Sequence, residues 1–93
     1  MAWSDAARAA AAEVRRRHKT ILISSVVTAH MVINKAKVAR YVAAMKKGVK
    51  FPRIQVTKRP SGYFDLHDGH HRLQAALKAG RLKINAKVLY GNL

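Results

Sequence analysis

Residues 63–80 read YFDLHDGHHRLQAALKAG, and within this stretch an alternating pattern gives way to a helical one. The first residues alternate between outward and inward positions, with Phe64 and Leu66 facing inward, which predicts a strand. An Asp-Gly pair closes that strand, and Gly80 is suited to end the helix that follows. The helix is expected over residues 70–78, with a buried face of Leu73, Ala76 and Leu77. The stretch therefore predicts a strand that leads directly into a helix.

Strands are predicted on both sides of this stretch. Residues 53–58 alternate with Ile54 and Val56 inward, and the Pro-Ser-Gly turn at 60–62 joins them to the next strand, so a β-hairpin is expected. After the helix, residues 83–89 alternate again, which predicts a last strand. The inward positions of this last strand are Ile84, Ala86 and Val88.

A second helix is predicted nearer the N-terminus. Asn34 can cap it, and the pattern continues to about Lys47, with Gly48 as the residue that stops it. Its apolar stripe at helical spacing consists of Val38, Tyr41, Val42 and Met45. The β-branched run at residues 21–27 precedes this helix and is predicted to be a strand.

The N-terminal segment is rich in alanine and arginine. Ser4 can cap a helix there and Asp5 complements the helix dipole, so a helix is predicted over residues 4–18. We expect residues 1–19 to form a basic arm and residues 20–93 to form one domain. Together the elements predict a small α+β fold, in which a mixed four-stranded sheet is accompanied by two packed helices and the Ala/Arg-rich N-terminal helix.

The charge of the chain indicates the kind of partner it has. It carries 19 Lys and Arg against 4 Asp and Glu, a formal net charge of +15 over 93 residues, which favours a polyanion such as DNA. The absence of cysteine excludes disulfides, thiolate metal sites and a cysteine nucleophile. No segment combines a basic face with a bulky apolar one, so no membrane attachment is expected. The candidate nucleic-acid-binding residues are Arg15, Arg16, Arg17, Lys19, Lys35, Lys37 and Arg40.

The junction between the predicted strand and helix, Asp68–Arg72, is a candidate phosphate-binding loop. The first turn of a helix exposes unpaired N–H groups and the positive end of the helix dipole, and both attract phosphate. Gly69 permits close approach of an anion, and Arg72 is suited to fork onto phosphate oxygens. The candidate cofactor-binding residues are Asp68, Gly69, His70, His71 and Arg72. A capped helix start with exposed polar residues explains the same sequence equally well.

Two catalytic interpretations of this region stay open. Its imidazole and carboxylate groups are the donor types that zinc or manganese prefers, but their spacing does not match the i, i+4 pair of a zinc-binding helix. These side chains are Asp65, His67, Asp68, His70 and His71. A histidine could also act as a general base in phosphoester hydrolysis, because imidazole titrates near neutral pH. The candidate catalytic residues are His70, His71 and Arg72, and no metal site is assigned.

The element order and the loop resemble the ParB/sulfiredoxin superfamily, the ParB-like nuclease domain. The resemblance covers residues 21–89, with a Pro-containing approach at residues 48–56 and a Gly-x-x-Arg loop at residues 69–72. The helix that this loop opens ends in Ala-Gly at residues 79–80. The resemblance implies a ParB/sulfiredoxin-like fold and a nucleotide- or phosphate-binding loop, with a nucleoside triphosphate, Mg²⁺ and DNA as the expected ligands.

The loop also departs from the patterns of the family. It reads Gly-His-His-Arg, where partitioning proteins usually have Gly-Glu-Arg-Arg and sulfiredoxins have Gly-Cys-His-Arg. The missing glutamate argues against triphosphate hydrolysis of the partitioning type, and the missing cysteine excludes sulfinic acid reductase activity. A domain this small and basic looks most like a phage or mobile-element protein, which is expected in the cytoplasm or inside a phage particle.

Three functions fit these observations. The leading one is a nonspecific DNA-binding ParB-like domain with a phosphate- or nucleotide-binding loop at Asp68–Arg72. The second is a metal-dependent nuclease or nucleotide phosphohydrolase. The third is a phage virion structural protein that contacts packaged DNA, which would place the chain in a homo-oligomer or a phage assembly.

Overall fold

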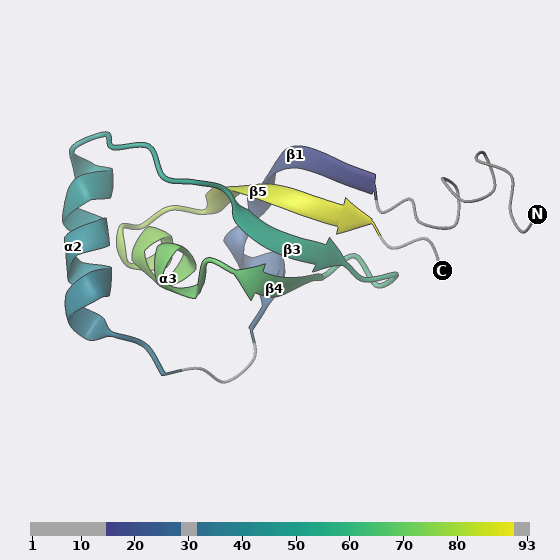
Figure 1. The fold of residues 1–93 in the computed structure, drawn as a ribbon, viewed down its shortest axis with the longest axis horizontal. Coiled ribbons are helices and arrows are strands. Elements are labelled where there is room, and N and C mark those ends of the chain that lie inside the picture. Colours follow the sequence, from purple (N-terminus) through teal and green to yellow (C-terminus); the bar gives the residue numbers. More distant parts are fainter. Residues whose placement is uncertain (1–14, 29–31, 91–93) are drawn as a thin grey trace, which may run out of the picture.

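The computed structural model describes residues 15–28 and 32–90 (Figure 1). Five strands form a mixed sheet in the order β1-β5-β3-β4-β2. The strands are β1 Arg15–Leu22, β2 Val26–Val27, β3 Ile54–Lys58, β4 Phe64–Asp68 and β5 Lys83–Tyr90. The helices are α2 Lys35–Lys46 and α3 His70–Lys78, and a short 3-10 helix covers Ile23–Ser25. The predicted α+β class with two packed helices is confirmed.

The core lies on one face of the sheet. Ile54, Val56 and Val88 of the two central strands are fully buried there. Helix α3 contacts β3 and α2 packs on α3, so that Val38 of α2 and Ala75 of α3 join the same buried cluster. Figure 1 shows both helices gathered at one end of the sheet. The short connection from β4 into α3 therefore lies beside the core, at the helical end of the molecule.

Residues 15–22 form an edge strand and not the end of a helix. Every residue of β1 is paired with β5 in an antiparallel ladder, and Ile21 is buried. The predicted helix is therefore wrong for residues 15–18, because the ladder to β5 satisfies the backbone there and overrides local helix propensity. The strand also crosses the predicted boundary between residues 19 and 20. The rest of the predicted helix, residues 4–14, lies outside the described residues.

The strand predicted for residues 21–27 is divided by a turn. The chain leaves β1, passes through the 3-10 helix and enters β2, which pairs in parallel with β4. The Ser25 hydroxyl donates a 2.6 Å hydrogen bond to the carbonyl of Leu22 and so closes the turn. Because β2 adds a short strand at the far edge, the sheet has five strands and not the four predicted.

The remaining predicted elements are confirmed, with one change in the buried surface. Asn34 caps α2 by accepting a 3.1 Å hydrogen bond from the N–H of Lys37, and Gly48 follows the helix with φ +85°. The bounds of α3 match the prediction, but Leu77 is 54% exposed and Ala75 is buried. Helix α3 contacts both α2 and β3, and it buries Ala75 as well as the predicted Leu73 and Ala76.

Candidate functional site

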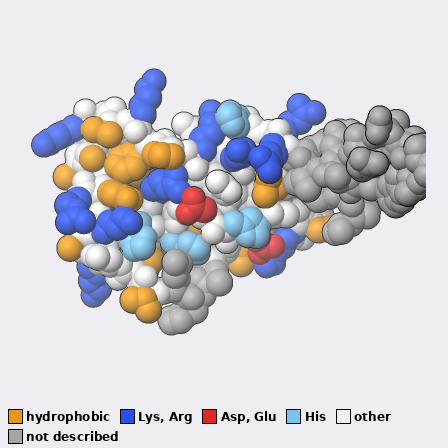
Figure 2. Space-filling view, viewed as in Figure 1, with side chains coloured by type: hydrophobic (Ala, Val, Ile, Leu, Met, Phe, Trp, Pro, Cys, Tyr) orange, Lys and Arg blue, Asp and Glu red, His pale blue; other side chains and the backbone are white. Residues whose placement is uncertain are grey.

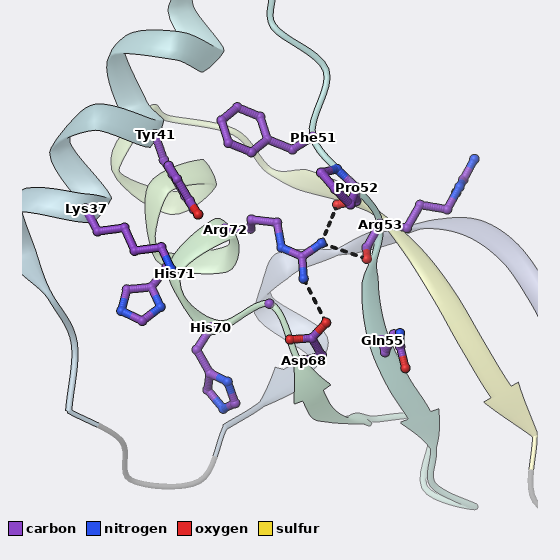
Figure 3. A pocket seen from close by; sticks show the side chains of 11 residues that line it. Lys37, Tyr41, Phe51, Pro52, Arg53, Gln55, Asp68, His70, His71 and Arg72 are labelled. Carbon is purple, nitrogen blue, oxygen red and sulfur yellow. Dashed lines mark hydrogen bonds and ion pairs between the residues drawn. The ribbon is translucent and has the colours of Figure 1, made fainter.

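A cavity of about 440 Å³ lies where the first turn of α3 faces α2 and the segment that leads into β3 (Figure 3). It is lined by Lys37, Tyr41, Phe51, Pro52, Arg53, Gln55, Asp68, Gly69, His70, His71 and Arg72. All of the predicted cofactor-binding residues, Asp68–Arg72, are thus brought to one place. The strand-to-helix junction predicted from the sequence forms one side of the cavity.

The first turn of α3 supplies backbone donors beside this cavity. Gly69 is the N-cap residue, and no side chain caps the turn. The Leu73 N–H donates to the Gly69 carbonyl at 2.8 Å, and the N–H groups of residues 70–72 come before this first intrahelical bond. No acidic residue lies within the first turn itself, and the carboxylate of the preceding Asp68 is paired with Arg72. This arrangement suits an anionic group.

The Arg72 side chain braces the wall of the cavity. Its Nη1 donates to the carbonyl oxygens of Pro52 at 2.8 Å and Arg53 at 3.0 Å, and its Nη2 donates to Oδ2 of Asp68 at 3.0 Å (Figure 3). The Arg72 side chain is 14% exposed, whereas that of Asp68 is 64% exposed. Asp68 therefore pairs with the arginine and does not cap the helix. Three of the five guanidinium hydrogens are engaged within the chain, which leaves Nε–H and one Nη2 hydrogen for a ligand.

The two adjacent histidines occupy different environments. Nε2 of His71 accepts a 3.2 Å hydrogen bond from the backbone N–H of Asn34, which assigns the proton of a neutral ring to Nδ1. This bond links the start of α2 to the start of α3. The half-buried His70 makes no side-chain hydrogen bond to the described residues and also lines the cavity. Figure 3 shows Lys37 reaching from α2 to the side of His71.

An aromatic wall of the cavity was not identified from the sequence. The ring centroids of Tyr41 and Phe51 lie 4.9 Å apart, and Nζ of Lys37 lies 5.6 Å from the centroid of the Tyr41 ring. The helical stripe predicts Tyr41 for the core, and its half-buried side chain also reaches the cavity. Phe51 lies in the Pro-containing approach at residues 48–56. This segment was the feature of the sequence from which an aromatic wall could have been predicted.

The predicted nucleic-acid-binding residues do not form a single patch. Three described ones, Arg16, Arg17 and Lys19, lie on β1, and three others, Lys35, Lys37 and Arg40, lie on α2. The alternation of β1 divides its residues again, because Lys19 is paired with the buried Ala86 whereas Arg16 belongs to the opposite face. The side chain of Arg15 lies outside the described part of the structure. Within that part, no helix is long and apolar enough to cross a membrane.

The candidate metal ligands take other partners. Across residues 15–28 and 32–90, no three His, Cys, Asp or Glu side chains are placed as a metal ion would require. Asp65 accepts hydrogen bonds from Nε and Nη2 of Arg59 at 2.8 and 2.5 Å, and these bonds lower the pKa of its carboxyl group. Nε2 of His67 lies 2.6 Å from Oγ1 of Thr57. The hydrolytic and virion interpretations stay predictions.

Comparison with known sequences gives a family and one curated relative. The model of the ParB N-terminal domain family matches residues 4–90. An uncharacterized protein of Methanocaldococcus jannaschii is 44% identical over 46 residues, which are 50% of this chain but 17% of that protein. The chain therefore corresponds to a small part of this relative.

Solved structures show the same fold. Sulfiredoxin from Arabidopsis thaliana superposes with a TM-score of 0.73 and 19% identity, over 81% of this chain and 86% of that one. The C-terminally truncated chromosome-partitioning protein ParB from Caulobacter crescentus, complexed with CTP-γ-S, has a TM-score of 0.66 and 18% identity, over 83% of this chain and 45% of that one. The predicted ParB/sulfiredoxin-like fold is thus confirmed.

Proposed function

Since the chain belongs to the ParB N-terminal domain family, we propose that it binds a nucleoside triphosphate with Mg²⁺ in the cavity at the start of α3 and associates with DNA without reading its sequence. The nucleotide would bind at the loop Asp68–Arg72, and DNA would bind to the charged surface of the domain.

The observation that carries the first part is the uncapped N-terminus of α3 opening into a cavity. The N–H groups of residues 70–72 are oriented donors, and the helix dipole adds positive potential at the same place. Lys37 and His70 flank these donors and supply side-chain donors from two different helices. The volume of about 440 Å³ lies within the range of small-ligand sites.

The residues of the loop would have distinct roles. Lys37, His70 and the first-turn amides would contact phosphate oxygens. Arg72 would act mainly as a positioning residue, because most of its donors hold Pro52, Arg53 and Asp68. The exposed carboxylate of Asp68 is the donor type that Mg²⁺ prefers, and this ion commonly uses one or two carboxylates together with phosphates. When bound, Mg²⁺ would neutralise part of the phosphate charge.

The structural neighbour from Caulobacter crescentus supports a nucleotide in this fold, because that ParB is complexed with CTP-γ-S. The Tyr41 and Phe51 rings provide an apolar wall that a nucleobase or ribose could contact. Neither ring offers a donor pattern that selects one base. We therefore expect the domain to recognise the triphosphate group and to accept more than one base.

The second part of the proposal rests on charge. The sequence carries 19 basic and 4 acidic residues. The two acidic residues in the described part of the chain, Asp65 and Asp68, are both paired with arginines. On the face seen in Figure 2, basic side chains accordingly predominate over acidic ones. A distribution of this kind attracts the phosphate backbone of DNA without a base-specific contact.

The nucleotide proposal is tested by isothermal titration calorimetry with CTP, ATP and tripolyphosphate in the presence of MgCl₂. We expect the wild-type chain to bind, and the change of both Lys37 and His70 to Ala to weaken binding at least tenfold. Lys78→Ala is the matched control, because this lysine lies at the opposite end of α3. Absence of binding to all three ligands, or an equal loss in the control, would refute the proposed site.

A further inference from the structure

The face of the sheet opposite the core carries mostly polar side chains, and most of them are exposed. On β5 the buried Ala86 and Val88 alternate with Asn85 and Lys87, whose side chains therefore belong to the other face. The hydroxyl of Thr20 on β1 donates a 2.8 Å hydrogen bond to Oδ1 of Asn85, as expected for paired residues on one face. We call this surface the outer sheet face. Its polar residues on β1 and β5 are Arg16, His18, Thr20, Lys83, Asn85 and Lys87, and Leu22 and Leu89 lie on the same face.

A row of side chains crosses the outer sheet face from the α3 cavity to the edge of the sheet. Gln55 of β3 is paired with Lys87, and Lys87 with His18. Gln55 also lines the α3 cavity, so the row begins at its wall. Because neighbouring strands lie about 4.8 Å apart, His18 stands roughly 10 Å from Gln55 across the sheet. The outer sheet face and the cavity are therefore one continuous surface.

On β1 and β5 the described side chains of the outer sheet face include basic groups and no carboxylate. Arg16, Lys83 and Lys87 are basic, and Arg16 and Lys83 are exposed. The two described carboxylates lie on β4, where Asp65 is paired with Thr57 and belongs to this face. Both are held by arginine partners, Asp65 by Arg59 and Asp68 by Arg72. Among the described residues, a polyanion would therefore meet basic side chains on β1 and β5 and no carboxylate on these two strands.

The outer sheet face also lacks the groups that read single-stranded bases. Its described positions on β1, β3 and β5 hold no Phe, Tyr or Trp. Proteins that bind single strands usually stack successive bases on aromatic rings. The side-chain amides of Gln55 and Asn85 can donate to phosphate or sugar oxygens. The chemistry of this face thus fits the sugar–phosphate backbone of a duplex.

We propose that duplex DNA binds across the outer sheet face, with Arg16, His18, Lys83 and Lys87 contacting backbone phosphates. This inference rests on the DNA association proposed above and assigns it to one surface. It also separates DNA from the nucleotide, because the duplex would lie beside the α3 cavity and not in it. Arg17 and Lys19, which belong to the core-side face of β1, are not part of this contact.

The experiment measures the salt dependence of duplex binding by fluorescence anisotropy with the full chain. In the test variant, Lys83 and Lys87 are both changed to Gln; in the control variant, Lys46 and Lys47 at the end of α2 are both changed to Gln. The two variants lose the same charge. Each phosphate contact contributes about 0.9 to the slope of log K against log salt, so the test variant should lose about 1.8 from this slope and the control almost nothing.

The outcomes separate the surface from the proposed function. If the control loses as much slope as the test variant, charge acts diffusely and the assignment to the outer sheet face is wrong. Tighter binding of a single strand than of a duplex of equal phosphate number also overturns it. If the wild-type chain binds no duplex even at low salt, DNA association itself fails. Unchanged CTP binding by the test variant, with unchanged circular dichroism, would show that the cavity and the fold are intact.

Discussion

A Cβ atom on Gly69 would lie 2.5 Å from Cγ2 of Ile54, a distance that real Cβ contacts essentially never show. Ile54 is fully buried at the start of β3, and Gly69 has φ +108°. The loop before α3 therefore lies directly on the central strand, and only a residue without a side chain fits there. The contact between Gly69 and Ile54 therefore positions the first turn of α3 close to β3, at the wall of the cavity.

Gly69→Ala is expected to destabilise the fold by about 3 kcal/mol, because the substitution adds a steric clash with a buried side chain to an unfavourable backbone conformation. Chemical denaturation of the variant would measure this loss. Gly62→Ala is the matched control, since Gly62 has φ +96° but no atom within 4 Å of its Cβ position. The control should lose only about 1 kcal/mol. Equal losses would show that packing against Ile54 is unimportant.

The local pattern predicts the elements around Gly69 but not their contacts. Alternation and helical spacing were sufficient for the hairpin, α2, α3 and β5, because each of these carries its own periodic apolar pattern. The first six residues of β1, 15–20, were missed, since the basic run at residues 15–19 has no apolar alternation and gains its structure from pairing with β5. Such long-range pairing overrides local propensity, and it cannot be predicted from the pattern of a short segment.

The junction between β4 and α3 was predicted correctly, whereas the structural role of Arg72 was not evident from the sequence. Its carbonyl partners belong to Pro52 and Arg53, far upstream in the chain, so their distance cannot be derived from the spacing of the loop. The sequence indicates an arginine suited to phosphate. The structure adds that this arginine is largely engaged in holding two segments together.

Arg72→Lys is expected to lower the free energy of unfolding by about 2 kcal/mol, because a lysine ammonium cannot reproduce the fork that serves two carbonyls and a carboxylate. Urea denaturation at neutral pH would measure the change. Asp68→Asn is the comparison, since it removes only the exposed ion pair and leaves both carbonyl bonds, and it should cost less than about 1 kcal/mol. A larger loss in Asp68→Asn than in Arg72→Lys would contradict the bracing role.

His71→Ala and His70→Ala are expected to have different effects. His71→Ala removes the acceptor of the Asn34 N–H, which should cost about 1 kcal/mol and speed hydrogen exchange at that amide. His70→Ala should leave the exchange of Asn34 unchanged, because its ring has no comparable bond among the described residues. Exchange measured by NMR on both variants distinguishes them. Equal acceleration of exchange in both would mean that the Asn34 contact is not specific to His71.

The ion pair between Arg59 and Asp65 should give the fold a pH dependence confined to acid. The hydrogen bond from Arg59 lowers the pKa of the Asp65 carboxyl, so the unfolded chain takes up this proton at a higher pH than the folded one. The stabilisation is therefore fully present above the unfolded value of about 3.9 and is lost as the pH falls through the lower folded pKa. Asp65→Asn should differ from wild type in urea midpoint by the same amount at pH 7 and pH 5, and this difference should shrink at pH 3 and below. If the difference in urea midpoint grows as the pH falls, the pair does not stabilise the fold through the ionised carboxylate of Asp65.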